Sequence, residues 1–219
     1  MNTSAPFSST AATAPLPDDC LGQHWLIIGD INTGKTSRCR HYLQQLCAQG
    51  LAARITVLDL APHIPPEMAQ ARGLPGAGGY LRPTVDSGVL DLRTHLHAPR
   101  LSSSTEAEAQ AKAESNARAI DALLQRLPPP ASGRDILFVN DVTLYLQAGS
   151  TDRLLAHIAQ PHMRTLIVNG YWGQRLGDSA LSRREREQII DHINLDQVTY
   201  SGFSKQAEAQ ARATIQRFA

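Results

Sequence analysis

The chain has 219 residues, of which 42% are hydrophobic and 19% are charged, and its formal net charge is +1 at pH 7. These values suit a globular protein with a hydrophobic core. The low net charge gives no reason to expect attraction to nucleic acid or to an anionic membrane. No apolar run in the sequence approaches membrane-spanning length, and no Lys or Arg precedes Lys35, so we expect no secretory leader. We expect a cytoplasmic protein.

The first 19 residues are mainly Ser, Thr, Ala and Pro, with almost no side chains that could enter a core. Such a composition predicts a disordered N-terminal tail. We therefore expect a single folded domain over residues 20–219. Its three cysteines are predicted to be reduced, because Cys39 and Cys47 lie about 12 Å apart along one predicted helix.

A glycine-rich segment follows the apolar run 25–28 and precedes a helix predicted over about 35–49. Its residues are Gly29, Asp30, Ile31, Asn32, Thr33, Gly34, Lys35 and Thr36. Glycines let the backbone curl so that successive N–H groups point into an anion-sized cup, and a helix N-terminus adds positive potential. Lys35 is predicted to reach the β- and γ-phosphates of a nucleotide, and the Thr36 hydroxyl to bind Mg²⁺. We extend the predicted nucleotide-binding segment to Ser37.

This motif resembles the Walker A element of the P-loop NTPase superfamily. The resemblance implies a three-layer α/β fold in which helices flank a mostly parallel sheet. It also implies Mg²⁺ together with ATP or GTP as the bound cofactor.

Further along the chain, strands and helices are predicted to alternate, which itself favours a mostly parallel sheet. Helices are expected at 105–127, 150–160, after Ser182 and from Ser204 onward, and strands at 24–29, 53–61, 134–141, 164–169 and 197–200.

Residues 62–104 interrupt this alternation with prolines and glycines, so we predict a long irregular insertion. The alternating piece at 89–93 suggests an edge strand within it. A stretch of this length is usually either functional or disordered. We favour a functional one and expect it to hold a second substrate or a protein partner. His95 and His97 are expected to face solvent rather than to bind a metal.

Two predicted strands end in a carboxylate that could orient Mg²⁺ or its waters. Asp141 ends the better match to a Walker B element, and Asp59 ends the second. Both are candidate catalytic and metal-binding residues, together with Lys35. The sequence leaves open which of the two carries the role.

The run 166–169 ends in Asn169, whose amide is expected to contact the purine of the nucleotide. The strand that ends at Asp59 and this late asparagine are similar to the class of dethiobiotin synthetase and the MinD- and ArsA-like ATPases. The same Asp59 element loosely resembles polynucleotide 5′-kinases. Trp172 stands where GTPases carry the guanine-selecting aspartate, so we expect ATP to be preferred over GTP.

The leading prediction is Mg²⁺-dependent binding and hydrolysis of a nucleoside triphosphate, coupled to a conformational switch. One alternative is a small-molecule or polynucleotide kinase, and another is a nucleotide-dependent assembly factor without hydrolysis. A homodimer is also compatible with the sequence. Arginines considered as charge-neutralising groups are Arg82, Arg175, Arg183, Arg184 and Arg186.

Overall fold

The computed structural model describes residues 20–74, 79–84, 87–192 and 197–200. Six strands form one sheet in the order β3-β2-β4-β5-β1-β6. Every neighbouring pair in this sheet is parallel. The predicted tail at 1–19 and the final helix expected from Ser204 lie outside the described residues. The strand bounds are β1 His24–Gly29, β2 Ile55–Asp59, β3 Leu90–Arg93, β4 Ile136–Asn140, β5 Thr165–Tyr171 and β6 Gln197–Tyr200.

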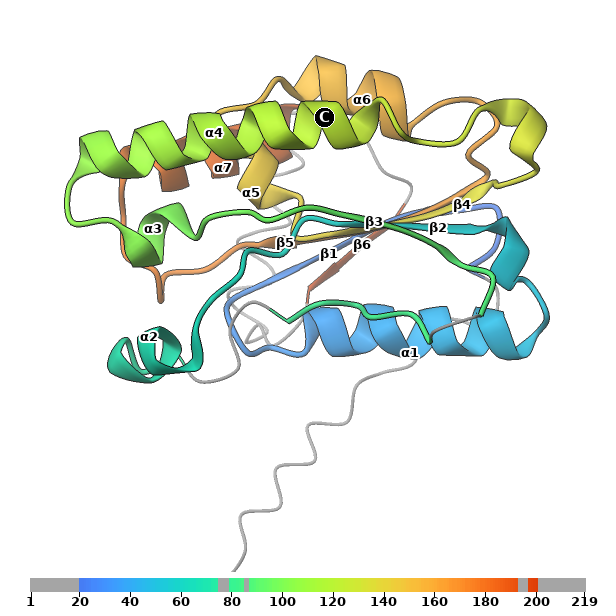
Figure 1. Cartoon of the computed structure of the whole chain (residues 1–219), viewed down its shortest axis with the longest axis horizontal. Helices are drawn as coiled ribbons and strands as arrows, with labels where there is room; N and C mark the ends of the chain where they lie inside the picture. The colour runs from blue at the N-terminus through green and yellow to red at the C-terminus, as the bar shows by residue number, and fades with distance from the viewer. Residues whose placement is uncertain (1–19, 75–78, 85–86, 193–196, 201–219) are drawn as a thin grey trace, which may run out of the picture.

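Helices cover both faces of the sheet, which confirms the predicted three-layer α/β fold. Helix α1 crosses one face, while α4, α5, α6 and α7 cover the other (Figure 1). The helix bounds are α1 Lys35–Ala48, α2 Pro66–Ala71, α3 Pro99–Ser102, α4 Glu106–Leu124, α5 Thr143–Leu146, α6 Thr151–Ile158 and α7 Ala180–His192.

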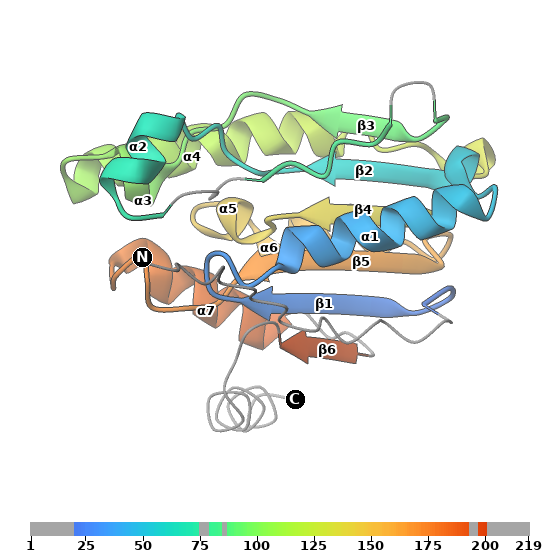
Figure 2. The ribbon, with the colours of Figure 1, turned by 90° about the horizontal axis from the view of Figure 1, so that it is seen from below.

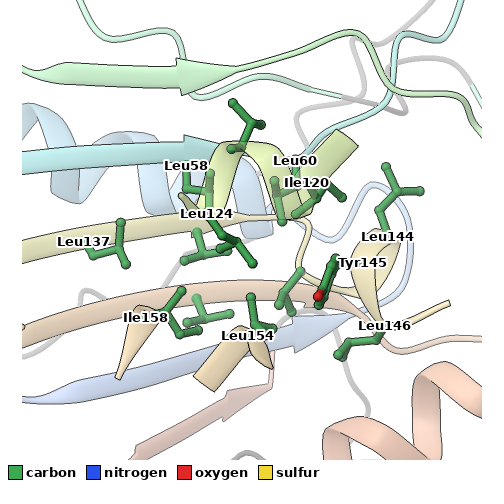
Figure 3. Packing of buried hydrophobic residues seen from close by; sticks show 14 of the residues in the cluster. Leu58, Leu60, Ile120, Leu124, Leu137, Leu144, Tyr145, Leu146, Leu154 and Ile158 are labelled. Atoms are coloured by element: carbon green, nitrogen blue, oxygen red, sulfur yellow. The ribbon is translucent and has the colours of Figure 1, made fainter. Parts of the chain in front are cut away.

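Alternation along the strands divides the core into two layers. In β1, Trp25 and Ile27 face α1, where they join a cluster that includes Tyr42 and Leu43. The intervening strand residue Leu26 belongs to the opposite cluster, which α4, α5 and α6 complete. Figure 3 shows this second layer, with Leu124, Tyr145 and other side chains packed above the strands. Burial on both faces explains why the strands are nearly continuous apolar runs.

The long irregular insertion predicted at 62–104 is partly regular. It contains the two short helices α2 and α3, and β3 pairs in parallel with β2 as the edge strand expected near 89–93. His95 and His97 are both exposed, as expected. The irregular part of the insertion is shorter than predicted because Pro66 and Pro99 stand at the first positions of helices rather than breaking them.

The parallel order brings the carboxyl ends of all the strands to one edge. Helix α1 follows β1 on one face, whereas α7 follows the neighbouring β5 on the other face (Figure 2). A crevice forms at an edge where successive helices leave on opposite sides, and ligands of α/β proteins bind there. Helices α2 and α3 lie at this same end of the sheet.

Candidate functional site

The loop between β1 and α1 is curled by left-handed backbone conformations. Asn32 has φ of 60° and Gly34 has φ of 86°. A Cβ at Gly34 would meet nothing within 4 Å, so glycine is favoured there by its backbone angle rather than by crowding. The Thr33 hydroxyl and the Lys35 Nζ both donate to the Asp30 carbonyl, at 2.9 and 2.6 Å. The loop is thus closed on itself, with its lysine folded against it.

The Asp30 side chain joins this loop to the segment that follows β5. Its Oδ1 accepts the Ile31 N–H at 2.6 Å, and its Oδ2 accepts the N–H groups of Gln174 and Arg175 at 3.0 and 3.4 Å. A Cβ placed on Gly173 would overlap the Asp30 carboxylate. Any other residue at position 173 would have to displace this carboxylate from its contacts with the second loop.

Replacing Gly173 with alanine should separate these two loops. We expect Gly173→Ala to destabilise the protein by about 1–3 kcal/mol through overpacking, which lowers the melting temperature by several degrees. In an Asp30→Ala background the same change should cost much less, because the carboxylate that it meets has been removed. Thermal unfolding of the four proteins measures this coupling, and equal costs in both backgrounds would contradict the contact.

Asn140, at the end of β4, connects the elements that surround the loop. Its Nδ2 donates to Asp59 Oδ1 at 2.6 Å and to the Gly79 carbonyl at 3.0 Å. Its Oδ1 accepts from Asn169 Nδ2 at 2.8 Å and, more weakly, from the Thr36 hydroxyl at 3.5 Å. An amide suits this position because it donates on one side and accepts on the other.

Asp59 is fully buried, and its carboxylate is occupied by protein donors. Besides Asn140, it accepts the N–H of Ala61 at 3.3 Å and the N–H of Leu81 at 2.8 Å. Burial raises the pKa of Asp59, and these hydrogen bonds act in the opposite direction. The carboxylate thereby ties the returning insertion at Gly79–Leu81 to the sheet, and this segment lies against the Thr36 methyl group.

Asp141 occupies a different environment, one residue beyond β4. It is partly exposed and has φ of 58°, an unusual angle for a residue other than glycine. Its Oδ1 accepts the Thr143 hydroxyl at 2.9 Å. Burial raises the pKa of Asp141, while Thr143 and the Lys35 ammonium lower it. Burial in turn lowers the pKa of Lys35, against the attraction of Asp141 and Asp30.

A pocket of about 280 Å³ opens between these groups. One wall is the loop, including Lys35 and Thr36, and Asn140 and Asp141 form the part contributed by β4. The opposite wall comes from α3, α5 and α7, with Arg100, Gln147 and Glu185. The loop, the insertion and three separate helices thus share one cavity at the carboxyl edge of the sheet.

A buried ion pair lies in the opposite wall. Arg100 donates from Nη1 to Glu185 at 3.0 Å, and the two side chains are 5% and 3% exposed. Its Nη2 donates to the Gly177 carbonyl at 2.6 Å, and its guanidinium stacks over Tyr171. Gln147 Nε2 donates to the other Glu185 oxygen. Burial raises the pKa of Glu185 to about 7, against the opposing attraction of Arg100.

This pKa makes stability depend on pH. A carboxyl group whose pKa is higher in the folded than in the unfolded protein favours folding when it is protonated. Its contribution is therefore lost as pH rises from the ordinary value of 4.5 to about 7. We expect Glu185→Gln to remove about 3 kcal/mol of this pH dependence. Unfolding measured at pH 4.5 and pH 8 tests this, with exposed Glu187→Gln as the control that should retain the dependence.

The predicted site residues fall into two groups. The pocket is lined by Ile31, Asn32, Thr33, Gly34, Lys35, Thr36, Ser37, Asp141 and Asn169. The pocket lining does not include Gly29, Asp30 or Asp59. Asp30 and Asp59 instead form hydrogen bonds with the lining residues Lys35 and Asn140. Asn169 is 2% exposed, and its amide contacts Asn140, Cys39 and the Asp141 N–H. Its amide groups are therefore engaged within the protein, and contact with a purine stays a prediction.

The proposed arginines are engaged away from the pocket. Arg183 and Arg186 pair with Asp178, Arg184 donates to the Gly149 carbonyl, and Arg82 stacks on Tyr80. Arg175 contributes its backbone to the Asp30 contact. The arginines that line the pocket are Arg40 and Arg100. Sequence reasoning missed Arg100, Gln147 and Glu185, since none belongs to a local motif. The available signal was weak: a glutamate that interrupts the arginine run 183–186.

Among the described residues, no group of three or more His, Cys, Asp or Glu side chains is arranged to hold a metal ion by itself. Mg²⁺ bound with a nucleotide needs no such group, because phosphates and waters supply most of its ligands. Thr36 and Asp141 are the pocket-lining oxygen donors suited to the remaining positions.

No helix in the described ranges is both long and apolar enough to cross a membrane. The sequence matches no protein-family model and no curated protein. Function is therefore inferred from the site itself.

Proposed function

We propose that this protein binds a nucleoside triphosphate with Mg²⁺ at the Gly29–Thr36 P-loop and hydrolyses its γ-phosphate. The observation that carries the proposal is that Lys35, Thr36 and Asp141 share one pocket at the carboxyl edge of a parallel sheet. A cation, a hydroxyl and a carboxylate around a curled loop are the groups that P-loop chemistry requires.

Each group has a role in this proposal. The N-terminus of α1 and the loop backbone bind the phosphates, and Lys35 moves from the Asp30 carbonyl to a phosphate oxygen. Thr36 and Asp141 would hold Mg²⁺ directly or through water, and the ion would neutralise phosphate charge. Arg100 lies in the opposite wall, where Glu185 compensates its charge. The charges of Lys35 and Mg²⁺ stabilise the negative charge that spreads over the transferred group.

The loops that meet at Asp30 offer a physical basis for the proposed switch. Asp30 lies within the P-loop and holds the segment at Gln174 and Arg175. Arg100 holds the same segment at Gly177 and also binds Glu185 of α7. A phosphate that draws Lys35 away from the Asp30 carbonyl would alter the first of these connections.

We retain ATP over GTP as the proposed nucleotide because Trp172 occupies the position of the guanine-selecting carboxylate.

Release of inorganic phosphate from Mg·ATP tests hydrolysis directly. We expect slow, Mg²⁺-dependent release that ceases in Lys35→Ala. Tight ATP binding without phosphate release would favour the assembly-factor alternative instead. Failure to bind any nucleoside triphosphate would contradict the proposal itself.

Phosphoryl transfer to a second molecule is the other candidate function. The observation that favours it is the far wall of the pocket, where Leu101, Leu144 and Leu176 accompany the Arg100–Glu185 pair. Hydrolysis requires a water molecule and no apolar surface of this kind. An apolar surface in a pocket usually contacts an organic ligand.

A further inference from the structure

The far wall of the pocket combines an apolar surface with incompletely paired polar groups. Its apolar part includes Ile64, Leu101, Leu144 and Leu176, contributed by the insertion, α3, α5 and the segment after β5. The polar part is the chain formed by Arg100, Glu185 and Gln147. Both parts open to the same cavity as Lys35 and Asp141.

In the network of Arg100, Glu185 and Gln147, two buried polar atoms have no hydrogen-bond partner within the part of the structure that is described. They are Arg100 Nε, which is a donor, and Gln147 Oε1, which is an acceptor. Buried polar groups are normally paired, so two orphan atoms on either side of one carboxylate are unusual. Both are shielded from water in the free protein. Pairing them with a ligand requires the two side chains, which line the pocket, to rotate.

The unpaired atoms also limit the chemistry of the ligand. A hydroxyl group can accept from Arg100 Nε and donate to Gln147 Oε1, whereas a carboxylate cannot donate and an ammonium cannot accept. The charge of Arg100 is already compensated by Glu185 at 3.0 Å. An uncharged head group therefore fits better than an ionised one, and the leucine-rich wall requires an apolar body.

We propose that the Arg100–Gln147–Glu185 wall is an acceptor subsite for a small, uncharged alcohol with an apolar body, which receives the γ-phosphoryl group. This inference rests on the proposed function, since it requires a triphosphate on the P-loop. It assigns that triphosphate an acceptor other than water.

The transfer requires only the triphosphate and the alcohol. The alcohol oxygen forms a bond to the γ-phosphorus as the bond between that phosphorus and the β–γ bridging oxygen breaks. The electron pair of the broken bond leaves with the nucleoside diphosphate. In the transfer step the hydroxyl exchanges its hydrogen bond to Gln147 Oε1 for one to Glu185, and its proton passes to that carboxylate, which Arg100 and Gln147 hold in position.

The test uses the full chain with Mg·ATP and three probes of equal length: pentan-1-ol, pentanoate and pentylamine. Phosphorus NMR measures pentyl phosphate and inorganic phosphate in the same sample. We expect pentyl phosphate from the alcohol and no acceleration of ADP formation by the two charged probes. Glu185→Gln should lower the ratio of pentyl phosphate to inorganic phosphate at least 10-fold.

Enlarging one side chain in the wall distinguishes a defect of the alcohol site from a general effect on the fold. Leu176→Phe narrows the proposed alcohol site and should lower the same ratio, while Leu155→Phe on α6 should leave it unchanged. Hydrolysis of ATP without pentyl phosphate would overturn the subsite and leave the proposed function standing. Equal stimulation by all three probes would also overturn it. Absence of any ATP binding would instead refute the proposed function.

Discussion

Lys35→Ala is expected to weaken triphosphate binding at least about 100-fold, because it removes charge-assisted hydrogen bonds worth about 1.5–3 kcal/mol each. Lys35 is the lysine that lines the pocket, and among the described residues its Nζ donates to the Asp30 carbonyl. The measurement is a titration of wild type and variant with Mg·ATP in a calorimeter.

The fold should survive this substitution. Burial lowers the pKa of Lys35, so the charged side chain costs folding free energy rather than contributing to it. We expect Lys35→Ala to melt at or above the temperature of the wild type. Arg126→Ala removes one exposed positive charge near the end of α4 and should bind ATP normally. Equal ATP affinity of Lys35→Ala and wild type would refute the P-loop assignment.

The two candidate carboxylates should respond differently to replacement by asparagine. Asp59→Asn should lower stability, whereas Asp141→Asn should lower turnover. Asp59→Asn places an NH₂ group among three donors, from Ala61, Leu81 and Asn140. Leaving buried donors unpaired costs about 1–3 kcal/mol each, so we expect the melting temperature to fall by on the order of 5–10 °C. Thermal unfolding measures this loss.

Asp141→Asn should keep the fold and lose turnover. Asparagine tolerates the left-handed backbone that position 141 adopts, and the change removes a carboxylate whose pKa burial raises. We expect Mg²⁺-dependent phosphate release to fall at least about 10-fold, the effect of removing one positioned charged group. Asp152→Asn, exposed on α6, is the matched control. A stable Asp59→Asn variant with less activity than Asp141→Asn would exchange the two roles.

Most of the sheet could be predicted because its strands carry the signal locally. The runs at 24–29, 134–141 and 164–169 are apolar on both faces, and each became a buried parallel strand. The insertion was harder to predict. Its segment at Gly79–Leu81 is held by Asp59, Asn140 and Arg40, and such long-range contacts leave no periodic pattern in the sequence.

The same distinction applies to the site. Lys35 and Thr36 belong to a contiguous motif, so eight adjacent residues predict their place. Arg100, Gln147 and Glu185 come together from three helices separated by up to 85 positions along the chain. Asp59 and Asp141 each follow an apolar run, and the sequence favoured Asp141 only as the better match to a Walker B element. In the structure, protein donors occupy the Asp59 carboxylate, whereas Asp141 lines the pocket.

Calorimetric titration of the full chain with ATP, GTP and AMP, each with and without Mg²⁺, tests the central claim most directly. The P-loop assignment predicts that Mg·ATP binds more tightly than ATP alone, more tightly than Mg·GTP and far more tightly than AMP, because the loop binds the β- and γ-phosphates. Equal binding of AMP and ATP, or no binding of either triphosphate in the presence of Mg²⁺, would contradict it.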